Sequence, residues 1–169
     1  MPTRKVKLVV GCILLVLFVL GALYFLRSMN TREQEQNFSS KLAAEVEKKR
    51  SSDNVVEIRF SDLADFKWDR VYIFTPYTPT KRIDEDLGYV WQPARSIDIS
   101  VRDDINLLIF TNTGKVVFYV EHPRNLGDLD GNYKQGGYSP DEAIFRVVEG
   151  EKQDNGLPWL RMKWKMHNK

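Results

Sequence analysis

One uninterrupted apolar run near the amino terminus constrains this chain more than any other feature. Residues 8–26 are 19 residues without a charged side chain. As a helix, a run of that length reaches roughly 28 Å, which nearly matches the hydrocarbon core of a bilayer, about 30 Å thick. The sequence therefore predicts a single transmembrane helix at residues 8–26.

The charges that flank this run predict its orientation. Arg4, Lys5 and Lys7 precede it, whereas Arg27 and Arg32 follow it more sparsely. Because basic residues favour the cytoplasmic side, we expect residues 1–27 to comprise a cytoplasmic end and the membrane helix, with the remainder exported.

Two alternatives use the same residues. The sequence before Cys12 resembles a lipoprotein processing box, but almost all of the apolar run follows that cysteine instead of preceding it. A cleaved signal peptide is the other alternative, although the residues after Leu26 lack the small-x-small pattern. Cys12 is the only cysteine, so no disulfide forms within the chain.

Residues 28–54 are polar and charged, and their only apolar stripe is Phe38, Leu42 and Val46. The spacing of four predicts a helical stalk. A stripe this thin could pair with a second copy as a coiled coil, but fewer than three clean heptads are present, so a solvated spacer is the preferred interpretation. The folded domain is then expected at residues 55–169.

The charge balance gives no support to nucleic-acid binding. The formal net charge is +2, and without the three basic residues before the apolar run 22 basic residues face 23 acidic ones. An exported part that is nearly neutral lacks the basic surface on which nucleic-acid binding depends.

An aromatic stretch at residues 66–79 leads into the domain. Residues 71–74 are apolar on both faces, which predicts a central strand covered on both sides. Thr78 can then cap a helix with Pro79 at its first position, and Gly88 suits the left-handed residue that ends it.

The charges of this predicted helix, residues 79–87, oppose its dipole. Lys81 and Arg82 come early, whereas Asp84, Glu85 and Asp86 come late. Either these charges are solvated or meet neighbours, or they serve a binding partner.

Residues 66–78 read FKWDRVYIFTPYT, and residues 87–91 read LGYVW. The first segment resembles a group of small bacterial membrane-anchored proteins and lipoproteins that carry the pattern FxWDxVYxFxPYT. The resemblance covers residues 66–91. It implies a bacterial cell-envelope setting, with the domain in the periplasm and the helix in the inner membrane, and it implies no chemistry.

Alternating or continuous apolar patterns predict further strands. With the strand at residues 71–74, the fold is expected to be α+β, an antiparallel sheet of about six or seven strands with one packed helix. Ser139 and Glu142 form a capping box, which predicts one helical turn. The other strands are expected at residues 55–60, 97–101, 105–111, 115–121, 144–148 and 157–166, with the middle three as a meander.

A glycine-rich loop is predicted at residues 122–138, and loops this long are often functional. Its Asp128 could begin a calcium loop, but Tyr133 and Ser139 stand where an EF-hand needs glycine and glutamate. We therefore expect no metal site. Together with the charged helix, this loop predicts a partner-binding surface of solvated side chains: Glu85, Asp86, Asp128, Asp130 and Tyr133.

Catalytic patterns are sparse. The exported part has two histidines, His122 and His167, and no cysteine, and no nucleophile elbow or phosphate-binding loop occurs. Asp69 is flanked by aromatic residues, and its ordinary interpretation is that it caps a turn or pairs with Arg70 or another cation. We expect no cofactor and no catalytic residues.

The sequence thus favours a membrane-tethered periplasmic protein that binds a protein partner, specifically an immunity protein that inhibits a toxin acting in the envelope. A tether would raise the inhibitor's effective concentration where the toxin arrives. An accessory or assembly subunit of an envelope complex is the alternative, and a hydrolase that uses carboxylates is the third.

Overall fold

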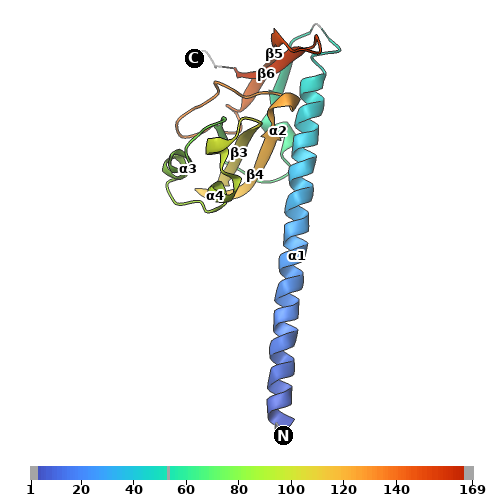
Figure 1. Ribbon diagram of the computed structural model, residues 1–169, viewed down its shortest axis with the longest axis vertical. Coiled ribbons are helices and arrows are strands. Elements are labelled where there is room, and N and C mark those ends of the chain that lie inside the picture. Colours follow the sequence, from blue (N-terminus) through green and yellow to red (C-terminus); the bar gives the residue numbers. More distant parts are fainter. Residues whose placement is uncertain (1–3, 53, 166–169) are drawn as a thin grey trace. The chain divides into compact units, whose positions relative to one another are not determined.

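The computed structural model describes residues 4–52 and 54–165, and within the first helix it describes side chains at residues 13–22 and from residue 33 onward. The chain divides into two compact units, Met1–Gln36 and Asn37–Lys169. Helix α1, Arg4–Glu47, begins in the first unit and ends in the second (Figure 1).

The predicted membrane segment lies within α1. In the part of the chain whose side chains are described, no helix is long and apolar enough to cross a membrane. Residues 8–12 and 23–26 of the predicted segment lie outside that part. The transmembrane helix therefore stays a prediction.

The strands of the second unit form two antiparallel sheets of three strands. One has the order β1-β5-β6, from Val56–Arg59, Ile144–Lys152 and Pro158–Trp164. The other has the order β2-β3-β4, from Arg70–Phe74, Ile105–Asn112 and Lys115–Pro123. The α+β class is confirmed, but the prediction of one continuous sheet is wrong, because alternation identifies a strand without identifying its neighbours.

Strand β3 is the centre of its sheet, and β2 lies at the edge. The first seven residues of β3 are buried, with Ile105, Leu107 and Ile109 on one face and Leu108 and Phe110 on the other. The prediction that β2 is covered on both faces is confirmed by the burial of Val71, Ile73 and Phe74. Its predicted central position is wrong.

Short helices cover the face of the β2-β3-β4 sheet that carries Ile105, Leu107 and Ile109. Helix α3, Thr80–Leu87, packs there with α4, Pro93–Ile97 (Figure 1). The prediction of a strand at residues 97–101 is wrong, because α4 ends there and a 3₁₀ turn, η1, Ile99–Val101, follows. Ile97 and Ile99 are both buried, so the alternating pattern correctly indicated which residues face the core. A run this short cannot distinguish a strand from a turn.

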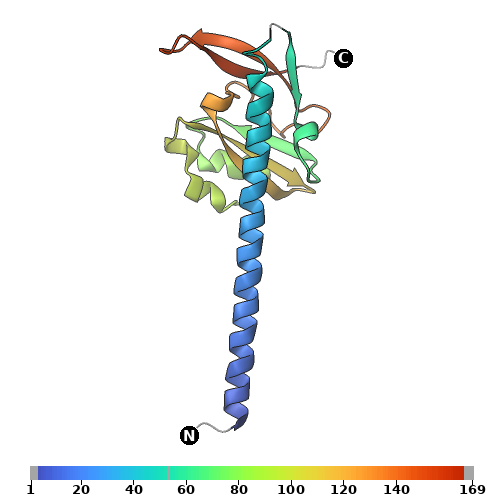
Figure 2. The same ribbon diagram turned by 90° about the vertical axis from the view of Figure 1, so that its right-hand side faces the viewer.

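The opposite face of this sheet packs on the last turns of α1 and on the β1-β5-β6 sheet (Figure 2). Phe38, Leu42 and Val46 are buried in this core, and the Phe38 ring meets those of Phe60 and Phe110 at centroid distances of 5.8 and 5.3 Å. The prediction that this stripe is a solvated stalk is wrong. Sequence spacing shows that a helix has an apolar stripe, but not what covers it.

Two local signals are confirmed and one is not. Gly88 ends α3 in the left-handed conformation, with φ 79°, and its N–H donates to the Asp84 carbonyl. Glu142 accepts a hydrogen bond from the Ser139 N–H at 3.0 Å, which is one of the two bonds of a capping box. Thr78 does not cap α3, which begins at Thr80 after Pro79.

The remaining short elements are helical turns. Helix α2, Phe60–Leu63, follows β1, and a 3₁₀ turn, η2, Arg124–Leu126, lies within the predicted glycine-rich loop. Phe60 and Leu63 are buried in the core shared with α1. The predicted first strand therefore ends one residue early, because Phe60 belongs to the helical turn.

Candidate functional site

A tight turn joins β2 to α3. The Thr75 carbonyl accepts two hydrogen bonds from Thr78, one from its hydroxyl at 2.7 Å and one from its N–H at 3.3 Å. The hydroxyl that was expected to cap the helix is therefore used to close the turn before it.

Tyr77 is held in this turn in an unusual conformation. Its φ is 62°, in the left-handed region that bulky side chains rarely adopt, and its N–H donates to the Ile99 carbonyl at 3.0 Å. The residue is 62% exposed. Such a conformation costs free energy and often occurs at binding sites, so this exposed ring is a candidate contact.

Three side chains form a second element of the site. Arg82 Nε donates to Asp86 Oδ2 at 3.2 Å, and the Arg82 guanidinium also donates to the Tyr133 hydroxyl. That hydroxyl donates to Asp86 Oδ1 at 3.2 Å, and the guanidinium carbon lies 4.6 Å from the Tyr133 ring centroid. The cluster joins α3 to the loop at residues 127–137, although Arg82 and Tyr133 are 51 residues apart.

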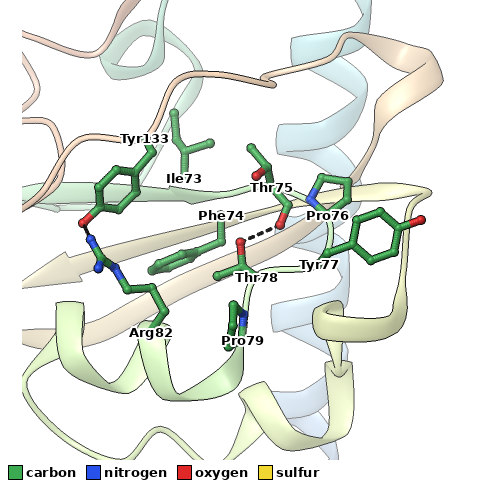
Figure 3. A pocket seen from close by; sticks show the side chains of 9 residues that line it. All are labelled: Ile73, Phe74, Thr75, Pro76, Tyr77, Thr78, Pro79, Arg82 and Tyr133. Carbon is green, nitrogen blue, oxygen red and sulfur yellow. Dashed lines mark hydrogen bonds between the residues drawn. The ribbon is translucent and has the colours of Figure 1, made fainter.

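The turn and two residues of the cluster, Arg82 and Tyr133, border an open hollow of ≈ 470 Å³ (Figure 3). Its lining is mainly apolar and aromatic, with Arg82 and Tyr133 beside Ile73 at one end and Tyr77 at the other. The residues that line it are Ile73, Phe74, Thr75, Pro76, Tyr77, Thr78, Pro79, Arg82 and Tyr133. A concave surface that combines apolar walls with polar groups is typical of a binding site.

The other charges of α3 meet neighbours. Asp84 accepts hydrogen bonds from Arg95 Nη2 at 2.7 Å and from the Trp91 N–H at 2.8 Å, which ties α3 to α4. The bond from Arg95, with that from the Trp91 backbone, holds the pKa of Asp84 below its usual value. Lys81 and Glu85 pair at 3.7 Å with both side chains exposed. Neighbouring side chains therefore explain much of the charge order.

Asp128 lies elsewhere and is buried. It accepts hydrogen bonds from Arg124 Nη2 at 2.7 Å, Asn106 Nδ2 at 3.1 Å and Trp159 Nε1 at 3.1 Å. Burial pushes the pKa of Asp128 up, but these hydrogen bonds outweigh it and hold the pKa below its usual value. The expectation that Asp128 is a solvated surface charge is wrong, because it organises a buried polar cluster.

His122 is buried as well. Its Nε2 lies 3.1 Å from the Gly127 carbonyl, and its Nδ1 lies 3.4 Å from the Ser39 hydroxyl of α1. The carbonyl can only accept, so Nε2 carries the proton and Nδ1 accepts from Ser39. Burial lowers the pKa of His122 to about 4, which keeps the ring neutral near pH 7.

The structure therefore separates the five predicted binding residues. Asp86 and Tyr133 meet beside the hollow, and Glu85 is exposed one residue away on α3. Asp130 is exposed, and its N–H donates to Asp128 Oδ1 at 3.1 Å. The three side chains described as hydrogen-bonded to Asp128 do not line the hollow.

Asp69 has the ordinary role expected of it. Its two oxygens accept from the Thr111 hydroxyl at 3.1 Å and from the Thr113 N–H at 2.6 Å, so it caps the turn between β3 and β4. Thr113 needs this support because its φ is 51°.

Sequence reasoning missed Arg82 and Tyr77 as individual site residues. The spacing of Arg82 and Asp86, four apart on a helix, signalled their pairing. No local signal predicted Tyr133 as their partner, because that contact depends on how the loop returns to β2.

Comparison with protein-family models, curated proteins and solved structures finds no match to this chain.

Proposed function

We propose that this chain is a membrane-tethered, protein-binding module of the bacterial cell envelope, and specifically an immunity protein that neutralises a toxin acting there. One observation carries the binding function. The turn after β2, helix α3 and the loop at residues 127–137 converge on one hollow, with Arg82 and two tyrosines at its rim. Tyrosine and arginine are the side chains that most often dominate the energy of protein interfaces.

The tether is supported by the first unit taken by itself. Residues 13–20 expose eight consecutive apolar side chains, and Phe18 is 74% exposed. Contiguous apolar surface of this kind needs a covering, and the charge-free run to which these residues belong makes lipid the fitting one.

In-cell photo-cross-linking tests the binding function. A benzophenone amino acid replacing Tyr77 keeps an aromatic ring at the exposed rim, and the same group at Val117, an exposed position on β4 outside the hollow, is the control. We expect a protein adduct in the envelope fraction from position 77 and none from position 117. Equal labelling, or no adduct at position 77, contradicts the proposed site.

The identity of the adduct tests the immunity role. The cross-linked protein, exported to the periplasm without this chain, should be toxic, and the chain should relieve that toxicity. Tyr77→Ser should relieve it less, because the exposed ring is lost while the turn's backbone bonds stay. A resident subunit of a stable membrane complex as the partner would instead indicate an accessory subunit and overturn the immunity role.

A further inference from the structure

Part of the outer edge of β2 is already paired with another segment of the chain. Val71 and Tyr138 exchange two backbone hydrogen bonds, each 2.8 Å long, on the side of β2 away from β3. Gly137 permits this approach, because a Cβ there would lie 2.8 Å from the Val71 carbonyl oxygen. The chain therefore occupies this edge at Val71.

Beyond that bridge the edge has no backbone partner among the described residues, although Ile73 is only 3% exposed. In an antiparallel strand the backbone groups of alternate residues point to the same side, so those of Ile73 and the N–H of Thr75 point where those of Val71 point. Within residues 4–52 and 54–165 this edge of β2 has no other strand pairing. The hollow lies along Ile73 and Thr75, so unpaired donors and an acceptor face a space that can hold an extended chain.

The charge at the rim selects a carboxylate. Among the described residues that line the hollow, Arg82 is the only charged one. Its side chain is 43% exposed, whereas that of its partner Asp86 is 7% exposed. A ligand in the hollow thus meets the guanidinium and not the carboxylate behind it.

The position of Arg82 favours the carboxyl terminus of a chain as the ligand. Figure 3 places Arg82 and Tyr133 at the Ile73 end of the hollow and Tyr77 at the other end. A strand added from the Tyr77 end reaches Ile73 and cannot continue, because Tyr138 occupies the next position of the edge. A chain that terminates at that point avoids the obstruction and brings a terminal carboxylate to Arg82.

We propose that the hollow binds the carboxyl-terminal segment of a partner protein as an added strand, antiparallel to β2, with its terminal carboxylate on Arg82. This inference rests on the proposed binding function and specifies the part of the partner that is recognised. The backbone hydrogen bonds give affinity that does not depend on sequence, and the apolar lining contacts a ligand side chain. Arg82 binds the terminal carboxylate.

The probes are two pools of random hexapeptides, one with a free terminal carboxylate and one with a terminal amide. Purified full-length chain should capture the carboxylate pool, and a peptide isolated from it should lose affinity about tenfold or more when amidated, because a charge-assisted bond is lost. Equal capture of the two pools overturns the proposal. Selective capture of amidated peptides with internal Asp or Glu overturns the chain-end assignment.

Two variants of α3 locate the carboxylate. Arg82→Gln should abolish the preference for the carboxylate pool, whereas Glu85→Gln, on the same helix and paired with exposed Lys81, should keep it. Thermal unfolding of both variants checks their folding, and the comparison of pools on the unmodified chain needs no variant. A preference that survives in folded Arg82→Gln contradicts the role of Arg82.

A methylation scan tests the added strand. Methylating one amide nitrogen of the isolated peptide at a time should weaken binding at alternate positions, since only alternate N–H groups face β2. Uniform tolerance rules out strand addition. If the cross-link from position 77 forms but the peptides show no carboxylate preference, the binding function stands and this mode falls; without the cross-link the binding function itself falls.

Discussion

At the scale of single residues, two buried polar side chains outside the hollow, Asp128 and His122, affect the stability of the fold. Asp128 and His122 lie in the same region, bracketing the turn that contains Gly127. Each is held by contacts from several elements, including α1 through Ser39 and β6 through Trp159. Their protonation states therefore bear on the stability of the whole second unit.

Acid should destabilise the protein through His122. Its folded pKa of about 4 lies below the ordinary value of 6.5, because burial disfavours the charged ring. Between these two pH values, His122 is therefore protonated in the unfolded chain and neutral in the folded chain. Stability is full above pH 6.5 and falls as pH drops toward 4, by about 2 kcal/mol at pH 5.

Urea unfolding at a series of pH values measures this decline. His122→Gln should remove the part of the slope between pH 6.5 and 4, whatever its effect on stability at neutral pH. Carboxylates with lowered pKa lose their stabilising contribution below their ordinary values, 3.8 for Asp128 and 4.5 for Glu142, so most of their effect falls below the His122 range. A slope that persists unchanged in the variant assigns the acid sensitivity to other groups.

Asp128 and Asp130 should differ sharply when neutralised. Asp128→Asn removes the charge that Arg124 faces across 2.7 Å and should cost about 3 kcal/mol, the low end for a broken buried pair, since Arg124 is partly exposed. Asp130→Asn alters an exposed side chain and should change stability by less than about 0.5 kcal/mol. Denaturant midpoints compare the two, and equal effects would contradict the buried role of Asp128.

At the scale of elements, the last turns of α1 matter most for stability. Leu42→Ala should cost about 2–5 kcal/mol, because the side chain is fully buried in a core that contains residues of both sheets. Lys41→Ala on the exposed face of the same helix should change stability by less than about 0.5 kcal/mol. Chemical denaturation of the full-length chain provides the comparison. If Leu42→Ala left the free energy of unfolding unchanged, this segment would be a solvated spacer after all.

Elements marked by strong local signals were predictable from the sequence. Strand β3 follows from a continuous apolar run, the end of α3 from Gly88, and the turn at Ser139 from its capping box. What failed depended on contacts between distant segments. Ile97 ends helix α4 and Ile99 begins the 3₁₀ turn η1, so both are buried without a strand. Phe38 lies on a stripe whose packing partner, Phe60, is 22 residues away.

The site divides in the same way. The sequence indicated that α3 and the glycine-rich loop both belong to it, because neither had a local explanation. It could not indicate that Tyr133 reaches Arg82 while Asp128, five residues earlier, is turned into the core. That difference follows from the pairing of Asp128 with β6 and of Tyr138 with β2, which no short sequence window contains.

At the scale of the whole molecule, the proposed function requires the second unit to face the periplasm. The basic residues before residues 8–26 outnumber those that closely follow, which favours a cytoplasmic amino terminus. Alkaline phosphatase, which folds to an active form only after export, should therefore be active when fused after residue 169 of the full-length chain in a bacterial host.

A matched fusion to residues 33–169 separates export from expression. It keeps the second unit and lacks the apolar run, so its phosphatase should be inactive while the protein accumulates. Replacing Arg4, Lys5 and Lys7 with glutamine should reduce activity of the full-length fusion, because these residues set the orientation. An inactive full-length fusion, together with activity from a cytoplasmic reporter at the same position, would reverse the orientation and place the hollow beside β2 away from any toxin that acts in the periplasm.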